Sequence, residues 1–174
     1  KTAFAALAGA LLFALPAAGA STLRHSFAGP EGEVPAAALV QATDGFLYGV
    51  AAHGGDFTRM PPDGGGTVFR VDGAGGFALL HVFGGTDGAV PTGLIQGRDG
   101  FFYGTTRYGG NTDATTALMS GAGTIFRMDG AGNVTVLKAF PGGPGGSYPG
   151  PIVQGADGAL YGTAAGGVLI GSEF

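Results

Sequence analysis

The apolar residues of this chain come in short runs separated by glycine-containing turns, and the same order of runs returns along the sequence. Three runs follow a proline and end in glutamine: Leu39-Val40-Gln41, Leu94-Ile95-Gln96 and Ile152-Val153-Gln154. An Asp-Gly pair follows each run, at Asp44, Asp99 and Asp157, with spacings of 55 and 58 residues. Asp-Gly between apolar runs is a strong hairpin signal. The pattern therefore predicts the first two strands of a repeated β unit.

Two further strands complete the predicted unit. The second strand carries the apolar pairs Leu47-Tyr48, Phe102-Tyr103 and Leu160-Tyr161. The third strand is expected at 66–70 and 123–127, and the fourth at 77–83 and 134–140. The succession of Phe101, Phe102 and Tyr103 is apolar on both faces, which is typical of a sheet packed between two others. Four strands in each repeat of about 55 residues predict an all-β fold, a β-propeller with four-stranded blades.

The strand inventory predicts whole and partial blades between residues 22 and 167. We expect an outer strand at 22–28, blade one at 35–84, blade two at 91–141 and a half blade at 149–164. The outer strand and the half blade are complementary, and alone they would leave unpaired sheet edges. Two chains joined head to tail would close a six-bladed ring, whereas three would exceed the usual range of about four to eight blades. The expected partner is a second copy, in a homodimer.

Both ends of the chain are expected to lie outside the propeller. Residues 1–21 combine one positive charge, an apolar run and small residues before Ser21, which predicts a signal peptide that is still attached here. Residues 168–174 are expected to be a tail, and 171–174 match what two adjacent cloning sites would encode, so the chain is expected to be a fragment. The predicted location is secreted or at the cell surface, with no membrane attachment after cleavage.

The repeated motifs resemble a known family. Asp99-Gly-Phe-Phe-Tyr-Gly-Thr-Thr106, a later Gly-Gly and Gly-Thr-Ile-Phe at 123–126 are similar to the GloVer-type tandem repeats of secreted bacterial proteins. The resemblance covers roughly residues 22–167 and implies a propeller-like fold and secretion. The matching residues look structural, so the resemblance assigns no catalytic residue. The third copy departs from the pattern, because no Gly-Thr-Val-Phe strand follows Tyr161.

Charge and composition narrow the classes of function. The formal net charge is −4 and only two residues are lysine. The chain therefore lacks the basic surface that contacts the phosphate backbone of a nucleic acid, and we set aside nucleic-acid binding. The chain has no cysteine, which rules out disulfides and thiolate metal sites. Its 38 glycines occupy fixed repeat positions, as expected for many tight turns.

The long loops after the second and fourth strands are predicted to share one face of the propeller, and function usually lies in such loops. His53 breaks the repeat there, because its counterpart in the next blade is Tyr108, and Asp56 follows it by three residues. A histidine near a carboxylate can act as a general base or a metal ligand. The candidate catalytic residues are His53, Asp56, Arg107 and Tyr108. The candidate metal ligands are His53, Asp56 and Asp113, for a divalent ion such as calcium or zinc. The alternative is that His53 is a solvated loop residue.

Other recurring polar residues have structural interpretations. Gln41, Gln96 and Gln154 could line the central channel, although hydrogen bonds between blades are the favoured role. His25 and His81 share an outer-strand position and are expected at the rim. Glu31, Glu33 and Asp87 could hold calcium, but loop carboxylates are usually just solvated. The aspartates of the Asp-Gly turns are expected to bond the turn backbone.

Three hypotheses of function follow. The first is a hydrolase of activated esters or phosphoesters, whose small-molecule site lies at the long-loop face of the assembled propeller. The second is a non-catalytic binding or adhesion module. The third is a purely structural segment of a repeat array. No Gly-x-Ser-x-Gly, His-Glu-x-x-His or phosphate-loop motif occurs in the sequence.

Overall fold

A computed structural model describes residues 11–14, 22–60, 62–110, 121–142, 146–165 and 167–171, with side chains described between 25 and 165. Within these residues the chain is built from strands, apart from one short 3-10 helix, η1 (Gly29–Glu31). The predicted all-β fold is therefore confirmed. The described part also contains no helix that is long and apolar enough to cross a membrane.

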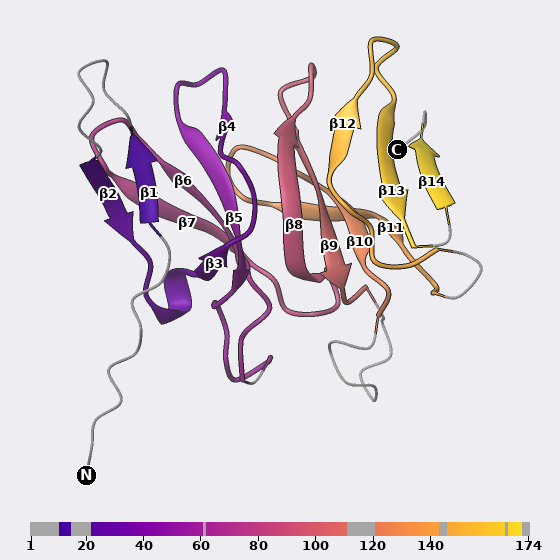
Figure 1. The fold of residues 1–174 in the computed structure, drawn as a ribbon, viewed down its shortest axis with the longest axis horizontal. Coiled ribbons are helices and arrows are strands. Elements are labelled where there is room, and N and C mark those ends of the chain that lie inside the picture. The colour runs from indigo at the N-terminus through magenta and orange to yellow at the C-terminus, as the bar shows by residue number, and fades with distance from the viewer. Residues whose placement is uncertain are drawn as a thin grey trace.

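Two complete antiparallel sheets form the middle of the structure (Figure 1). In the first sheet, β3 (Glu33–Pro35) and β4 (Val40–Gln41) both pair with β5 (Leu47–His53). β3 and β4 therefore act as one interrupted inner strand. Beyond β5, the sheet continues with β6 (Thr67–Val71) and then with the outer strand β7 (Phe77–Val82). In the second sheet the order from one edge is β8 (Ala89–Gln96), β9 (Phe102–Tyr108), β10 (Thr124–Met128) and β11 (Val134–Ala139). Each sheet is one four-stranded blade in chain order.

The structure gives both partial blades one strand more than the sequence predicted. After β12 (Ile152–Gln154) and β13 (Leu160–Ala164), the strand β14 (Gly167–Gly171) pairs with β13. Gly162 lies opposite Leu169 in this pair, as Gly49 lies opposite Phe69 in the first blade. The apolar run after Gly167 thus takes the third-strand position, although it lacks the Gly-Thr-Val-Phe signature and was expected to be a tail.

The other added strand is β1 (Leu11–Ala14), which pairs with β2 (Thr22–Ser26). Phe13 pairs with Leu23 as Phe69 pairs with Leu79, and the ladder shifts register just before both phenylalanines. β1 therefore copies a third strand and β2 a fourth. The described part of the predicted signal peptide is a strand, and the rest of residues 1–21 lies outside the described residues. The fold does not test cleavage or secretion, which stay predictions.

The turns and long loops lie on opposite sides of the molecule. In Figure 1 the hairpin turns between β4 and β5, β8 and β9, and β12 and β13 all lie at the top, whereas the loop that follows β5 and the end of β9 lie toward the bottom. The inner strand β8 contacts β4 on one side and β12 on the other, so the inner edges of the blades converge. The predicted long-loop face is thus present, with the ends of β5 and β9 on it.

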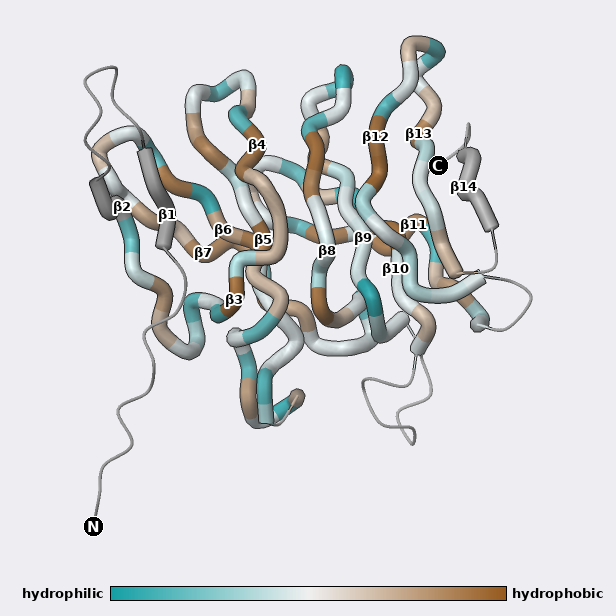
Figure 2. The backbone as a smooth tube through the Cα atoms, viewed as in Figure 1, coloured by the Kyte–Doolittle hydropathy of each residue, from teal (hydrophilic) through white to brown (hydrophobic). Residues whose placement is uncertain are grey.

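The main core lies between the first two blades. Tyr48 is fully buried with its ring centroid 4.1 Å from that of Phe102, and Val68, Phe83 and Phe126 belong to the same cluster. Figure 2 shows hydrophobic stretches along β8 and β12 and hydrophilic ones at the turns. The glycines after Tyr48 and Tyr103 make room for a ring, because a Cβ on Gly49 would lie 2.5 Å from Phe69 Cζ and one on Gly104 would meet Phe126 Cζ. This explains the Tyr-Gly pair in the motif.

The motif glutamines join neighbouring blades. Gln96 accepts a hydrogen bond from the Thr43 N–H of the preceding blade at 2.9 Å, and Gln154 accepts one from the Arg98 N–H at 3.0 Å. Each also donates from Nε2 to a carbonyl oxygen of its own turn, that of Gly100 or Gly158. The favoured prediction of bonding between blades is confirmed for these two glutamines.

Candidate functional site

His53 is the last residue of β5, on the long-loop face, and it pairs with Glu33 of β3 across the strand ladder. Its side chain is half-buried. The Nδ1 atom is withdrawn from solvent and has no hydrogen-bond partner among the described residues. A buried polar atom without a partner costs about 1–3 kcal/mol, and such atoms call for an explanation such as a catalytic role or a bound ligand.

The other two histidines are held by carboxylates. His25 Nε2 lies 3.2 Å from Glu31 Oε2, and His81 Nε2 lies 2.7 Å from Asp87 Oδ2. Each histidine lies on a fourth strand, β2 or β7, six residues before its carboxylate partner. The sequence placed these histidines at the rim but did not predict their partners. Since the chain has three histidines and all lie in the described part, His53 is the one without a carboxylate partner there.

The carboxylate of Asp87 is fixed by two hydrogen bonds, one to His81 and one to the Gly84 N–H. Burial raises the pKa of its carboxyl, but the hydrogen bonds from His81 and from the Gly84 N–H outweigh this effect and leave the pKa below its usual value. The second carboxylate oxygen accepts the Gly84 N–H at 2.9 Å. Asp87 is therefore an ionised anchor for the loop before β8.

Asp56 has a local structural task. Its Oδ1 accepts hydrogen bonds from the Thr58 N–H at 2.9 Å and the Thr58 hydroxyl at 2.5 Å, and also from the Arg59 N–H. The Thr58 hydroxyl is the main cause that lowers the pKa of Asp56. No hydrogen bond joins Asp56 to His53 in the described residues, so the structure does not bring this predicted pair together.

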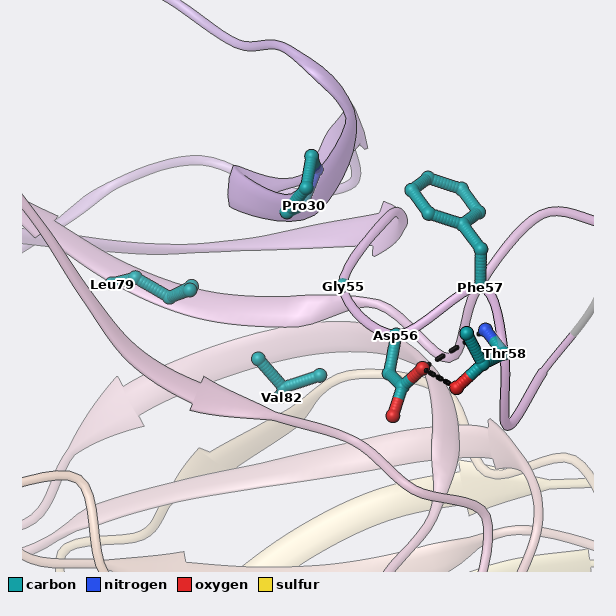
Figure 3. A pocket seen from close by; sticks show the side chains of 7 residues that line it. All are labelled: Pro30, Gly55, Asp56, Phe57, Thr58, Leu79 and Val82. Carbon is teal, nitrogen blue, oxygen red and sulfur yellow. Dashed lines mark hydrogen bonds between the residues drawn. The ribbon is translucent and has the colours of Figure 1, made fainter.

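A shallow pocket of about 500 Å³ lies beside Asp56 (Figure 3). Pro30 of η1, Phe57, and Leu79 and Val82 of β7 supply apolar walls around the Asp56 carboxylate. Figure 3 shows the Asp56 carboxylate turned toward Thr58, with which it forms its dashed hydrogen bonds. The pocket lies at the outer strand β7, and no histidine is among its lining residues.

Arg107 and Tyr108 belong to an aromatic cluster at the end of β9. The Tyr108 ring meets that of Tyr148 edge to face, with centroids 5.5 Å apart, and the Arg107 guanidinium carbon lies 5.7 Å from the Tyr108 centroid. Tyr148 is 48% exposed and Arg107 is also exposed. We call these three residues the tyrosine–arginine cluster. They offer flat apolar surface next to a positive charge.

Tyr148 was not among the predicted site residues, although its position in the repeat is unusual. Tyr148, Val34 and Val90 all have positive φ values, of 52°, 56° and 56°, and each precedes a proline. Positive φ is uncommon for residues other than glycine and a genuine outlier for valine, and such strain clusters at functional sites. The signal available in the sequence was the tyrosine that replaces valine before the third proline.

His53 and the tyrosine–arginine cluster lie on either side of the start of β8. Ala89 of β8 pairs with Tyr108 of β9. On the other side, a Cβ on Gly66 would lie 2.5 Å from both Pro91 Cδ and the Ala51 carbonyl oxygen, so β8 begins against the end of β5. The ends of β5, β8 and β9 therefore form one row along the long-loop face.

The metal-site predictions find no support in the described residues. They contain no group of three or more histidine, aspartate or glutamate side chains arranged to hold a metal ion. Asp113, the third predicted ligand, lies outside the described residues. Glu31 and Asp87, which were considered as calcium ligands with Glu33 but expected to be solvated, are each engaged by a histidine.

The fold defines a class of protein, the β-propellers. The structure resembles a catalytically inactive histidine-to-alanine variant of virginiamycin B lyase from Staphylococcus aureus with quinupristin (TM-score 0.53, 17% identity, 92% of this chain and 47% of the other). It also resembles a putative gluconolactonase (TM-score 0.51, 18% identity, 88% and 50%). Both are propeller proteins, and this chain spans about half the length of each.

The family is shown by a second comparison. Residues 5–172 match the model of the Gloeobacter/Verrucomicrobia repeat, so the chain belongs to this repeat family. The resemblance noted in the sequence is thereby confirmed. No curated protein matches the chain.

Proposed function

We propose that the chain hydrolyses activated esters or phosphoesters at the long-loop face of the assembled propeller, with His53 as the general base. The observation that carries the proposal is the unpartnered Nδ1 of His53, in a chain whose other histidines are tied to carboxylates. A base needs a free lone pair within reach of the proton that it removes. The other two histidines lie on the outer strands β2 and β7, whereas His53 ends β5 on the long-loop face.

The proposed tautomer of His53 follows from burial. A proton on Nδ1 would be a buried donor without an acceptor, so we assign the proton to Nε2 and the lone pair to Nδ1. Nδ1 is covered in the present structure. The loop after β5 therefore has to open enough to admit one water molecule. That water attacks the carbonyl carbon or phosphorus, His53 takes its proton, and the bond to the leaving oxygen breaks.

The tyrosine–arginine cluster supplies the remaining parts of the proposed site. Arg107 would stabilise negative charge that develops on the ester or phosphoryl oxygens. The exposed face of Tyr148, with Tyr108 beside it, would hold an aromatic leaving group by ring stacking. Asp56 has no part in catalysis under this proposal. Its hydrogen bonds to Thr58 and to the Arg59 N–H stabilise the turn that follows His53. The proposal thus keeps His53, Arg107 and Tyr108 in the site and adds Tyr148.

The two structural neighbours support an enzymatic use of this fold. One is a lyase whose inactive form has a histidine replaced by alanine, and the other is named as an enzyme of a lactone, a cyclic ester. Their identities of 17% and 18% carry only the fold, so neither assigns a residue or substrate here.

A second candidate function is a binding module without catalysis. The tyrosine–arginine cluster favours it, because flat aromatic surface beside a cation binds planar or anionic molecules without needing a base. Under this alternative, ligands bind at Tyr148 and are released unchanged.

Turnover of a panel of aryl esters and phosphotriesters separates the two candidates. We expect hydrolysis by the wild-type chain, and a loss of about 10²-fold in kcat in Arg107→Ala, the order seen when one charge-stabilising donor is removed. Parallel assays after chelator treatment, with metal content measured by mass spectrometry, test the predicted divalent ion. Binding of aryl ligands that depends on Tyr148, without turnover of any substrate, would establish the binding module instead.

A further inference from the structure

We propose that the two open ends of this chain bind a second copy of it, so that two copies close one propeller ring. At each junction β12 and β13 of one copy and β1 and β2 of the other form a shared blade. The interaction surface is therefore the open face of the third blade on one side and the exposed inner edge of the first blade on the other.

The glutamine bonds between blades define the first contact. Thr43 N–H bonds to Gln96 of the next blade, and Arg98 N–H bonds to Gln154 of the blade after that. Two positions in this series lack their counterpart within the described chain: Gln41, which is exposed, and the N–H of Ala156. Ala156 takes the repeat position of Thr43 and Arg98. Ala156 of one copy thus donates to Gln41 of the other.

The open face of the third blade is apolar at positions that the first blade packs against its neighbour. Val153 is 62% exposed, whereas the equivalent Val40 packs into the core between the first two blades. Tyr161 is half-buried, as is the equivalent Tyr103, whereas Tyr48 of the first blade is fully buried against the next blade. The missing neighbour is therefore another blade of the same kind, because the equivalent residues already pack against one.

The β1–β2 hairpin fits the position of that shared blade. Phe27, which follows β2, packs against Phe69 with ring centroids 4.7 Å apart, so the hairpin already lies against the first blade as a preceding blade would. The register of β1 places Phe13 at the position of Phe69 and Phe126, the residues paired with Gly49 and Gly104. Gly162 is the matching glycine of β13. β1 of the second copy then replaces β14 beside β13, with Phe13 opposite Gly162.

The size of the chain agrees with two copies. It spans 47% and 50% of two solved propellers, so two copies match the length of one ring. Four whole blades and two shared blades give six, within the usual range of about four to eight.

Sedimentation equilibrium of the purified chain tests the proposal. We expect twice the chain mass of 17.0 kDa. Val153→Asp places a charge in the proposed contact and should reduce the mass to that of one copy. Val136→Asp is the matched control, since Val136 is also exposed but lies on the outer strand β11. The control should keep the mass of two copies.

A thiol cross-link identifies the contact itself, because the chain contains no cysteine of its own. A short bifunctional thiol reagent should join Gln41→Cys to Ala156→Cys between copies and double the mass on a denaturing gel. The pair Thr43→Cys with Gln96→Cys is the control, which should react within one chain.

Each outcome decides the proposal. A mass of one copy at all concentrations overturns it, and blades of a longer chain would then be the natural neighbours. Polydisperse aggregates, equal behaviour of Val153→Asp and Val136→Asp, or reaction of the control cysteines without a cross-link at Gln41 and Ala156, would contradict it as well.

Discussion

The Tyr103 hydroxyl donates a hydrogen bond to Asp99 Oδ2 at 2.7 Å, across the Asp-Gly turn that joins β8 to β9. Oδ1 of the same carboxylate accepts the Phe101 N–H at 3.2 Å. The same two bonds recur at Asp44 with Tyr48 and at Asp157 with Tyr161. One aspartate therefore holds both the turn and the second strand, which explains why Asp-Gly-x-x-Tyr returns in every repeat.

Truncation of Tyr48 should be costly because its ring fills the core between the first two blades. Tyr48→Ala should lower the free energy of unfolding by about 3–5 kcal/mol, as large aromatic truncations do. Tyr48→Phe keeps the ring and loses one hydrogen bond, so it should cost about 0.5–1.5 kcal/mol. Urea titration measures both. Equal costs for the two variants would show that the ring does not carry the packing.

Alkaline pH should weaken the tyrosine–aspartate bonds. Burial, followed by the hydrogen bond to Asp44, raises the pKa of Tyr48. A raised folded pKa contributes stability that is present below the ordinary tyrosine value of about 10 and is lost as the pH rises through the folded value. Unfolding measured between neutral and strongly alkaline pH should show this loss in the wild type and less of it in Tyr48→Phe. If the wild type and Tyr48→Phe lost the same amount of stability at alkaline pH, the assigned role of the Tyr48 hydroxyl would be contradicted.

Acid should release the Asp87 anchor. Its folded pKa is lowered, since the bonds from His81 and Gly84 outweigh burial, so its contribution is present above the ordinary value of about 4 and is lost as the pH falls through the folded value. Asp87→Asn should thus lower Tm at pH 7 and have less effect near pH 3. The exposed Asp63→Asn is the control and should change Tm little at either pH. A constant difference between Asp87→Asn and wild type at both pH values would refute the assignment.

The strained residues before the prolines offer a different kind of test. Val34 has a φ of 56° and is 55% exposed, so Val34→Gly relieves strain and removes little packing. Strain of this kind costs about 1–3 kcal/mol, and we expect Tm to hold or rise. Val50→Gly, at a buried position of β5, should instead lower Tm strongly. A drop in Val34→Gly as large as that in Val50→Gly would mean that the Val34 side chain packs in the native protein.

The sequence was most informative where a residue repeats. Recurring residues predicted the order of strands, the Asp-Gly turns and the bonding of Gln96 and Gln154 between blades. They did so because a residue that recurs at the same repeat position makes the same local contacts in each blade. β1 was missed because its apolar run also has the composition of a signal peptide. β14 was missed because Gly167, Val168 and Leu169 stand where the repeat has Thr-Val-Phe.

The candidate site was harder to predict because its residues do not repeat. His53 attracted notice by breaking the pattern, but its lack of a partner is a property of packing, which no spacing in the sequence reveals. Asp56 lies three residues from His53 and yet bonds its own turn, since its side chain reaches the Thr58 N–H and hydroxyl first. The ring contact between Tyr108 and Tyr148 joins two blades and depends on their relative placement.

The role of His53 is the central claim, and the turnover of two histidine variants tests it most directly. Purified His53→Ala and His81→Ala should be compared with the wild type in kcat for one aryl ester or phosphotriester, with Tm measured on the same samples. We predict that His53→Ala loses about 10²-fold or more in kcat, as expected for a missing general base, with Tm nearly unchanged. His81→Ala should lose Tm through its bond to Asp87 but keep its turnover while folded. Wild-type kcat in His53→Ala would contradict the account and leave the binding module as the better explanation.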